Sequence, residues 1–262
     1  MRNRSLYILL LGAIIAGQAL FSGSPAAARS LLDQAGRRVE IPERPQRIVA
    51  LAPSVTEIVF ALGAGDRLIG VTQHSTFPAE AARLPMVGSY VRLDIERIVG
   101  LRPDLCIAVK DGNPKAAVDR LQALGVAVYA LDPRSVETVI GAILDLGAVL
   151  AAEPRAETLA AQMRARIEQV TRRVVGIDRR PRVFFQIGAA PIVSVGTLTF
   201  AHELIELAGG ANVAAGAAAY PRFSREQVLG LAPEVIVISS MDRAAGAVEE
   251  SRREWARWPG VP

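Results

Sequence analysis

The chain has 262 residues and a formal net charge of +4 at pH 7, and 51% of its residues are hydrophobic against 21% charged. This composition excludes an intrinsically disordered chain, and the length favours two domains of about 100 to 130 residues each. The basic residues are dispersed except in "RRVVGIDRRPR" from Arg172, which a solvated helix end explains, so we expect no nucleic-acid partner.

The N-terminal segment 1–28 has the layout of a secretory signal peptide. Two arginines precede an apolar stretch from Leu6 to about Leu20, and the small-residue run Ala26-Ala27-Ala28 follows. We therefore predict an exported protein that is cleaved near Arg29. A membrane-anchoring helix is the alternative, because the apolar stretch is nearly long enough to span a bilayer.

Segment 29–150 alternates short apolar runs with helical patterns. The runs "RIVALAP", "LIGVT", "DLCIAV" and "VAVYAL" predict four buried strands. Strands that alternate with helices indicate a parallel sheet covered by helices. The single cysteine, Cys106, falls in the third strand, where we expect an inert core thiol that cannot form an internal disulfide.

Three helices are predicted between these strands. In the first, Ser54 and Glu57 form a capping box and Gly63 stands at the helix end. The second begins at Asp94, and Asn113 with the following proline opens the third.

From Ser135 the pattern is almost unbroken helix, and Pro154 begins its second segment. One face of that segment carries apolar residues at steps of three and four: Leu159, Met163, Ile167, Val170 and Val174. A helix of about 23 residues spans roughly 35 Å. We expect segment 151–179 to form a rigid strut between two lobes, with a helix packed on a single domain as the alternative.

In segment 180–262 the alternation begins again. "RVFFQIG" and "EVIVIS" predict strands, "FAHELIELAGG" and "SREQVLGLAP" predict helices, and "PIVSVG" fits a strand or a turn. This order repeats that of the first lobe, so the sequence predicts two α/β lobes.

One stretch is written twice: "ERIVGLRPDLCIA" from Glu96 and "EQVLGLAPEVIVI" from Glu226. The shared leucine, glycine and proline follow from a helix that must stop before a buried strand. The need to end the helix does not explain why both copies carry a glutamate at the same position. Each either interacts favourably with its helix dipole, by about 0.3 to 1 kcal/mol, or contacts an arginine on a partner.

In combination, the phrases "RIVALAPSVTEIVFALGAGDRLIGVT", "FAHELIELAGGANV" and both copies of the repeated stretch resemble the solute-binding proteins of ABC importers for cobalamin, haem and iron-siderophores. The resemblance runs from Arg47 to the C-terminus. It implies an α/β fold of two Rossmann-like lobes with parallel sheets, joined by one long rigid α-helix. It also implies a periplasmic monomer that captures a corrinoid such as cobalamin between the lobes and delivers it, without chemistry, to permease subunits in the inner membrane.

The resemblance also assigns residues. It gives Glu96 and Glu226 the role of docking onto permease arginines, and it places His74, Tyr90 and Tyr220 in the ligand cleft. The match is imperfect, because His74 and Tyr90 stand where the family pattern has a tyrosine and a tryptophan. Val109 takes another position that is usually tryptophan, so the expected cleft is less aromatic.

The two tyrosines occupy corresponding positions, each four residues before a predicted helix. They are therefore expected to face each other across the cleft, where aromatic faces suit a large flat ligand. For His74 a solvent-facing loop residue is the alternative, and for Tyr220 a packed loop residue.

Other ligands remain open. Haem is the main alternative, with Tyr90 as a phenolate ligand to iron, and His74 is a further candidate axial ligand for a corrinoid with an open site. Ferric siderophores are a third choice, because Arg92 and Arg222 are expected near the cleft. A zinc or manganese site is disfavoured, since the only other histidine, His202, is expected to be structural.

An enzyme is disfavoured, because the sequence has no G-x-S-x-G elbow, P-loop or dinucleotide fingerprint. An exported hydrolase using His74 and a nearby serine is a remote alternative. The ending "REWARWPGVP" suggests a truncated second lobe by comparison with the family pattern. Trp255 and Trp258 are expected in the packing of that lobe or at the cleft rim.

Overall fold

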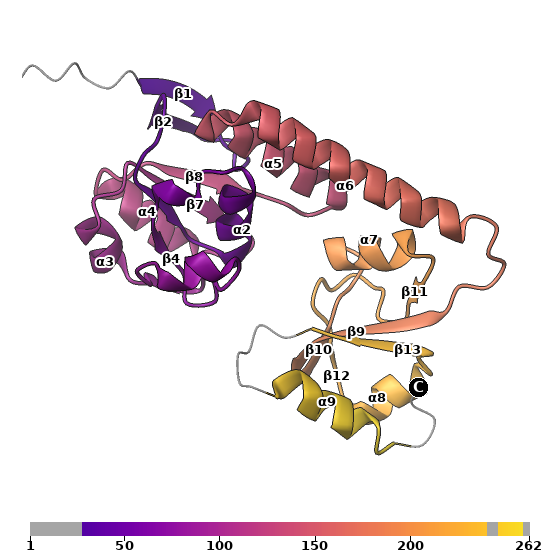
Figure 1. The fold of residues 1–262 in the computed structure, drawn as a ribbon. Helices are drawn as coiled ribbons and strands as arrows, with labels where there is room; N and C mark the ends of the chain where they lie inside the picture. The colour runs from indigo at the N-terminus through magenta and orange to yellow at the C-terminus, as the bar shows by residue number, and fades with distance from the viewer. Residues whose placement is uncertain (1–27, 240–245, 259–262) are drawn as a thin grey trace, which may run out of the picture.

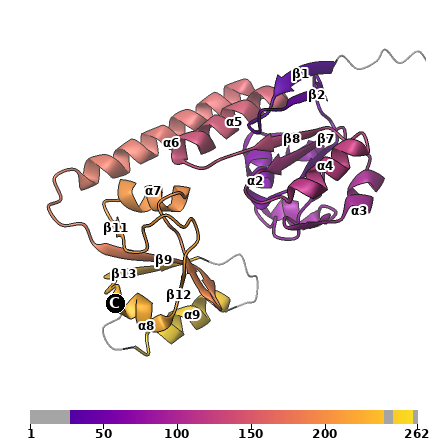
Figure 2. The same ribbon diagram turned by 180° about the vertical axis from the view of Figure 1, so that it is seen from behind.

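The computed structural model describes residues 28–239 and 246–258 and places them in two α/β lobes connected by a long helix (Figures 1 and 2), as predicted. The expected signal peptide therefore lies outside the described residues except for Ala28. Within the described ranges, no helix is both long and apolar enough to cross a membrane.

The N-terminal lobe is built on a four-stranded parallel sheet with the order β4-β3-β7-β8. Its strands confirm the four apolar runs: β3 (Ile48–Ala50), β4 (Leu68–Val71), β7 (Leu105–Val109) and β8 (Val128–Leu131). Alternate residues enter opposite cores, because successive side chains of a strand point to opposite faces. Ile48 belongs to one buried cluster and Val49 to the other.

Helices cover both faces of this sheet. Helices α2 (Pro53–Ala61) and α5 (Val136–Leu150) supply apolar residues to one core, and α3 (Ile95–Gly100) and α4 (Lys115–Ala123) supply the other. The carboxyl ends of the parallel strands are left for loops, which is where α/β proteins bind ligands.

The observed N-termini of the helices differ in part from the predicted ones. The predicted capping box of Ser54 and Glu57 is wrong, because α2 begins at Pro53 and its N-cap, Ala52, has no side-chain hydrogen bond. Proline favours the first helical position, and it draws Ser54 inside the helix. Asp94 caps α3 as predicted, since its carboxylate accepts the backbone N–H of Arg97 at 2.9 Å.

Six short elements of this lobe were not predicted, among them the two short strands on either side of Tyr90. Strands β1 (Ala28–Leu32) and β2 (Arg38–Pro42) form an antiparallel hairpin beside α5. Two 3-10 turns, η1 (Gly65–Arg67) and η2 (Ala79–Arg83), flank β4.

Helix α6 (Glu153–Val174) runs from the N-terminal lobe to the C-terminal lobe (Figure 1). It packs along α5, with Ala156 and Ala160 buried at the contact. The predicted apolar face is buried as far as Ile167, while Val170 is 43% exposed. Beyond Ile167 the helix has left the core of the first lobe, and Val174 is half-buried beside Gly209 of the C-terminal lobe instead.

The C-terminal lobe is arranged around the long strand β9 (Arg182–Ala189). Strands β11 (Ala211–Asn212) and β13 (Val235–Ile238) pair with it in parallel, and β10 (Ile192–Ser194) pairs antiparallel to both β9 and β12 (Arg222–Phe223). "PIVSVG" thus contains a strand. The sheet is mixed, because β10 pairs antiparallel with its neighbours while the other strand pairs are parallel.

The helices of this lobe are α7 (Phe200–Leu207), α8 (Arg225–Gly230) and α9 (Ala247–Trp255). Trp255 is buried as a packing residue and meets the ring of Phe184 edge-on at 6.5 Å between centroids.

The duplicated stretch folds into the same unit in both lobes. Helices α3 and α8 have six residues each, and each is followed by a residue with positive φ, Arg102 at 50° and Ala232 at 42°. These left-handed residues end the helix and turn the chain into proline and the next strand.

The acidic residue of each copy also has a structural role. Asp104 accepts the backbone N–H of Arg47 at 3.0 Å, and Glu234 accepts that of Arg182 at 3.0 Å. The guanidinium groups of both arginines in turn donate to the carbonyl oxygens of the two residues that directly follow α3 and α8. Each lobe therefore ties its first strand to the end of the duplicated helix by the same set of hydrogen bonds.

Candidate functional site

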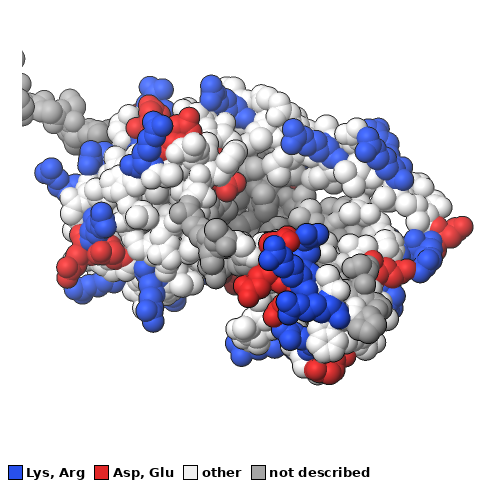
Figure 3. Space-filling model, turned by 60° about the horizontal axis from the view of Figure 1, so that its bottom comes forward, with Lys and Arg blue, Asp and Glu red and all other residues white. Residues whose placement is uncertain are grey.

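A cleft of about 770 Å³ lies between the lobes, and Figure 3 shows the surface hollowed there. The C-terminal lobe supplies most of its wall, including Phe185, Ile187, Phe200 and Leu204. Polar groups are few among these apolar side chains, as in most pockets for organic ligands. From the N-terminal lobe, the lining includes Tyr90.

Tyr90 stands in the tight turn between β5 (Gly88–Ser89) and β6 (Arg92–Leu93). The buried amide of Asn113 donates to the carbonyl oxygens of Tyr90 and Leu51, both at 2.8 Å, and its side-chain oxygen accepts the N–H of Val109 at 2.8 Å. The Tyr90 ring lies so near Gly112 that a Cβ atom there would be 3.2 Å from Cδ2. The turn is therefore held by the loop that follows β7.

Tyr220 lies on the opposite side of the cleft and is 50% exposed. Its hydroxyl donates a hydrogen bond to Oδ2 of Asp111 in the other lobe, at 3.2 Å. Burial, the Asp111 charge and this hydrogen bond raise the pKa of Tyr220 above its ordinary value, so the phenol is neutral and donates at pH 7. The structure thus brings the two predicted tyrosines together from opposite lobes.

His74 is not among the residues that line this cleft. Its Nε2 atom lies 2.9 Å from the side-chain amide nitrogen of Gln73, and its Nδ1 atom is buried without a hydrogen-bond partner among the described residues. The turn that carries it is tied to the Tyr90 hairpin by a bond from the N–H of Gln73 to the Gly88 carbonyl. His74 therefore neighbours the site without forming its wall.

Glu96 and Glu226 occupy the first turns of α3 and α8, and both side chains are exposed. A hydrogen bond with Ser224, followed by one to its own backbone N–H, lowers the pKa of Glu226. Both carboxylates lie outside the cleft, one on each lobe. Arg92 and Arg222 are also exposed, and the cleft lining includes neither of them.

A charged rim beside Tyr220 was missed by the sequence analysis. Asp132 accepts hydrogen bonds from Lys110 at 2.9 Å and from Arg134 at 2.8 Å. Burial acts to raise the pKa of Asp132, but these bonds and charges outweigh it and lower the pKa. The sequence carried only a signal of position: Asp132 directly follows β8 and Asp111 stands two residues after β7, both at carboxyl ends of parallel strands.

The lobes also touch away from the cleft. Glu203 of α7 accepts the backbone N–H of Val136 at 2.6 Å, and so it satisfies an N-terminal donor of α5 in the other lobe. Leu207 of α7 packs against the same cluster as Ile140 and Ile167. Helix α7 therefore couples the C-terminal lobe to the α5 and α6 pair.

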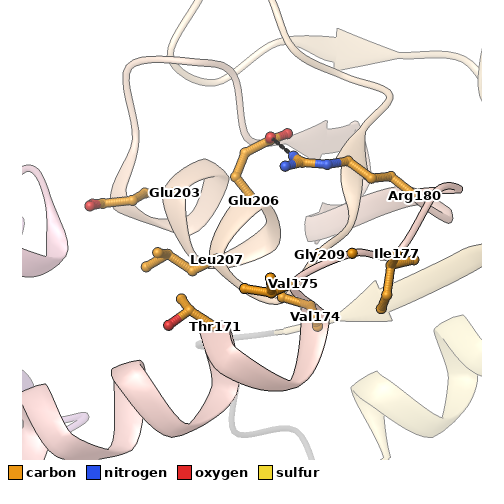
Figure 4. Close-up of a pocket in the computed structure, with 10 residues that line it drawn as sticks. Thr171, Val174, Val175, Ile177, Arg180, Glu203, Glu206, Leu207 and Gly209 are labelled. Atoms are coloured by element: carbon orange, nitrogen blue, oxygen red, sulfur yellow. Dashed lines mark hydrogen bonds and ion pairs between the residues drawn. The ribbon is translucent and has the colours of Figure 1, made fainter.

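A second hollow of about 460 Å³ lies under the end of α6, where Thr171 and Val174 face α7 (Figure 4). The cation on its wall, Arg180, is paired with Glu206. Its lining contains none of the residues predicted to bind ligand. The cleft between the lobes is therefore the better candidate site.

His202 and Cys106 fit structural roles. Nδ1 of His202 lies 3.2 Å from the side-chain amide of Asn212. Cys106 is fully buried, and burial raises its pKa to about 12 with a smaller contribution from Asp104. Among the residues that the structure describes, no three His, Cys, Asp or Glu side chains gather as they would around a metal ion.

Two α/β lobes that enclose a cleft and are joined by a long helix define a bilobal ligand-binding protein. The chain belongs to the periplasmic binding protein family, whose model matches residues 48–261.

Several relatives narrow the comparison. A vitamin B12-binding protein of Yersinia pestis is 33% identical over 195 residues, which cover 74% of this chain and 69% of that protein. The crystal structure of the periplasmic vitamin B12-binding protein of Vibrio cholerae superposes with a TM-score of 0.69 at 30% identity, over 81% of this chain and 84% of that one.

A periplasmic haem-binding protein from Pseudomonas aeruginosa superposes with a TM-score of 0.74 at 27% identity, over 83% of this chain and 79% of that one. All three similar proteins are named as binding proteins.

Proposed function

We propose that the protein captures cobalamin or a related corrinoid between its lobes and delivers it to the permease of an ABC importer, without chemistry. The observation that carries this proposal is the pair Tyr90 and Tyr220, which enter one apolar cleft from opposite lobes. A corrin is a large flat body, and facing aromatic rings bury such a body at small entropic cost. The similarity to vitamin B12-binding proteins supports the same ligand class.

Glu96 and Glu226 carry the second half of the proposal. Their carboxylates are exposed at the same point of the same structural unit in both lobes, and outside the cleft. A carboxylate recognises an arginine side chain through two parallel hydrogen bonds, which fix geometry as well as affinity. We infer that the two glutamates dock onto arginines of the permease.

Haem is the second candidate, and it has its own support. The tyrosine in the β5–β6 turn is a possible phenolate ligand for iron, and a haem-binding protein is among the similar structures. His74 is a less direct candidate for an axial role, since the cleft lining does not include it.

The test is a side-by-side titration of the mature protein with cyanocobalamin, cobinamide and haemin, followed by calorimetry and visible absorbance. We expect one-to-one corrinoid binding that is much tighter than haemin binding. Tight haemin binding with a tyrosinate-type spectrum that disappears in Tyr90→Phe would instead assign the protein to haem import. Turnover of generic esters by the pure protein would contradict a binding protein altogether.

A further inference from the structure

We propose that Asp111 is a specificity-determining residue of the cleft, and that its carboxylate selects macrocycles edged with neutral carboxamides over macrocycles edged with carboxylates. The proposal rests on the function proposed above and refines its substrate class. Two aromatic walls alone cannot make this choice, because a flat ring system of either kind stacks on them equally well.

The position of Asp111 follows from the fold. It stands two residues after β7, at the carboxyl end of the parallel sheet. The cleft lining does not include Asp111, but its Oδ2 atom accepts the hydroxyl of Tyr220, a lining residue, at 3.2 Å. The carboxylate therefore lies at the rim of the cleft, next to the hydroxyl end of one wall. A ligand stacked on the Tyr220 ring therefore has its edge next to this carboxylate.

The two nearby carboxylates, Asp111 and Asp132, have different hydrogen-bond partners. Lys110 and Arg134 both donate to Asp132, so one carboxylate engages both nearby cations. The hydrogen bond shown for Asp111, by contrast, comes from a neutral phenol, although the charge of Asp111 also interacts with that of Arg134. A carboxylate has about four lone-pair sites, so this bond leaves Asp111 capacity to accept from a ligand.

This arrangement discriminates by chemistry. A carboxamide edge presents N–H donors, and a hydrogen bond from a neutral donor to a carboxylate is stronger than one between two neutral groups. A carboxylate edge presents no donor at neutral pH and meets a like charge a few ångströms away. One residue therefore both attracts the first edge and repels the second.

The experiment compares cobinamide, whose ring carries amides, with cobyrinic acid, whose ring carries carboxylic acids, on the full mature chain. Asp111→Asn keeps an oxygen that accepts from Tyr220, removes the charge, and replaces the other oxygen with an NH2 donor. We expect the wild type to prefer cobinamide, and Asp111→Asn to reduce that preference about tenfold, mainly by binding cobyrinic acid more tightly. High salt should reduce the wild-type preference as well, because it screens an exposed charge.

Asp119→Asn is the matched control, since Asp119 is an exposed carboxylate on α4 that pairs with Lys115 away from the cleft. It should leave both affinities unchanged. If wild type binds cobinamide and Asp111→Asn changes the preference less than twofold, the role of Asp111 is refuted while the proposed function stands. A wild type that binds haemin and neither corrinoid refutes both proposals, because haemin itself carries carboxylates.

Discussion

Asn113 fixes the position of Tyr90, although its own side chain does not line the cleft. Its buried amide joins three chain segments, through the carbonyl oxygens of Leu51 and Tyr90 and the N–H of Val109. Removing it leaves buried backbone groups without partners, which costs about 1 to 3 kcal/mol each. One amide thus determines the geometry of the N-terminal wall.

We expect Asn113→Ala to weaken cobinamide binding about tenfold, because the Tyr90 turn loses the contact that orders it. Calorimetric titration measures the loss, and a thermal melt confirms that the variant is folded. In a double-mutant cycle, Tyr90→Ala should add little once Asn113 has been removed. Additive losses would mean that Asn113 acts independently of the tyrosine.

Cys106 gives a direct test of burial in the first lobe. Its pKa of about 12 keeps the thiol protonated at pH 8, and only a thiolate reacts rapidly with alkylating reagents. We expect iodoacetamide to label the native protein at least about a hundredfold more slowly than the protein in concentrated urea. Mass spectrometry reports this one site without ambiguity, since the chain has a single cysteine. Fast labelling of the native protein would show that the strand is exposed.

The sequence located some of the cleft residues and not others, for identifiable reasons. The positions of Tyr90 and Tyr220, which both line the cleft, could be predicted because they stand at the same offset from corresponding helices. For Asp111 the sequence offered only its position after a parallel strand, because the hydrogen bond that places it beside Tyr220 joins residues 109 positions apart. His74 was expected in the wall, but the orientation of its turn depends on the neighbouring hairpin.

Helices α3 and α8 show how one structural unit serves two lobes. The sequence revealed both helices, because their apolar spacing and their caps, Asp94 and Ser224, are local signals. It did not reveal the arginines that tie each unit together, because Arg47 and Arg182 are distant in sequence from the helix ends that they contact. The capping box predicted at Ser54 was wrong because Pro53 takes the first helical position and places Ser54 inside the helix.

These helices also carry a prediction about transport. We expect Glu96→Ala combined with Glu226→Ala to leave corrinoid affinity unchanged and to reduce uptake through the reconstituted transporter at least about tenfold. Both side chains are exposed and lie outside the cleft, so their removal should not disturb ligand contacts. Radiolabelled corrinoid uptake into proteoliposomes measures the effect.

Glu57→Ala is the control for that experiment, because Glu57 is an exposed glutamate on another helix of the first lobe. It should transport normally. If the double variant lost ligand affinity instead, the glutamates would have to be reassigned to the cleft.

Packed helices, rather than a flexible hinge, connect the two lobes. Helices α5 and α6 pack side by side, and α7 of the C-terminal lobe packs against this pair. Glu203 adds a hydrogen bond from one lobe to a helix terminus of the other. An open and a closed state would require these packed helices to slide, which permits only small displacements.

We therefore expect ligand binding to change the radius of gyration by less than about 1 Å. Small-angle scattering of the protein with and without saturating cobinamide measures this change. A compaction of several ångströms would show that the packed helices bend and that the lobes close like a hinge.

The packing of α5, α6 and α7 has a consequence for binding to a partner that contacts both lobes at once. Because α6 connects the lobes, it also sets the span between Glu96 and Glu226. If the two glutamates dock as proposed, the second engages at a high effective concentration once the first is bound. Two individually weak contacts then act as one bivalent attachment that fits a single spacing. A permease that separates the lobes to release the ligand would also increase the distance between the two glutamates. Release of the ligand and dissociation of the empty binding protein would then occur together.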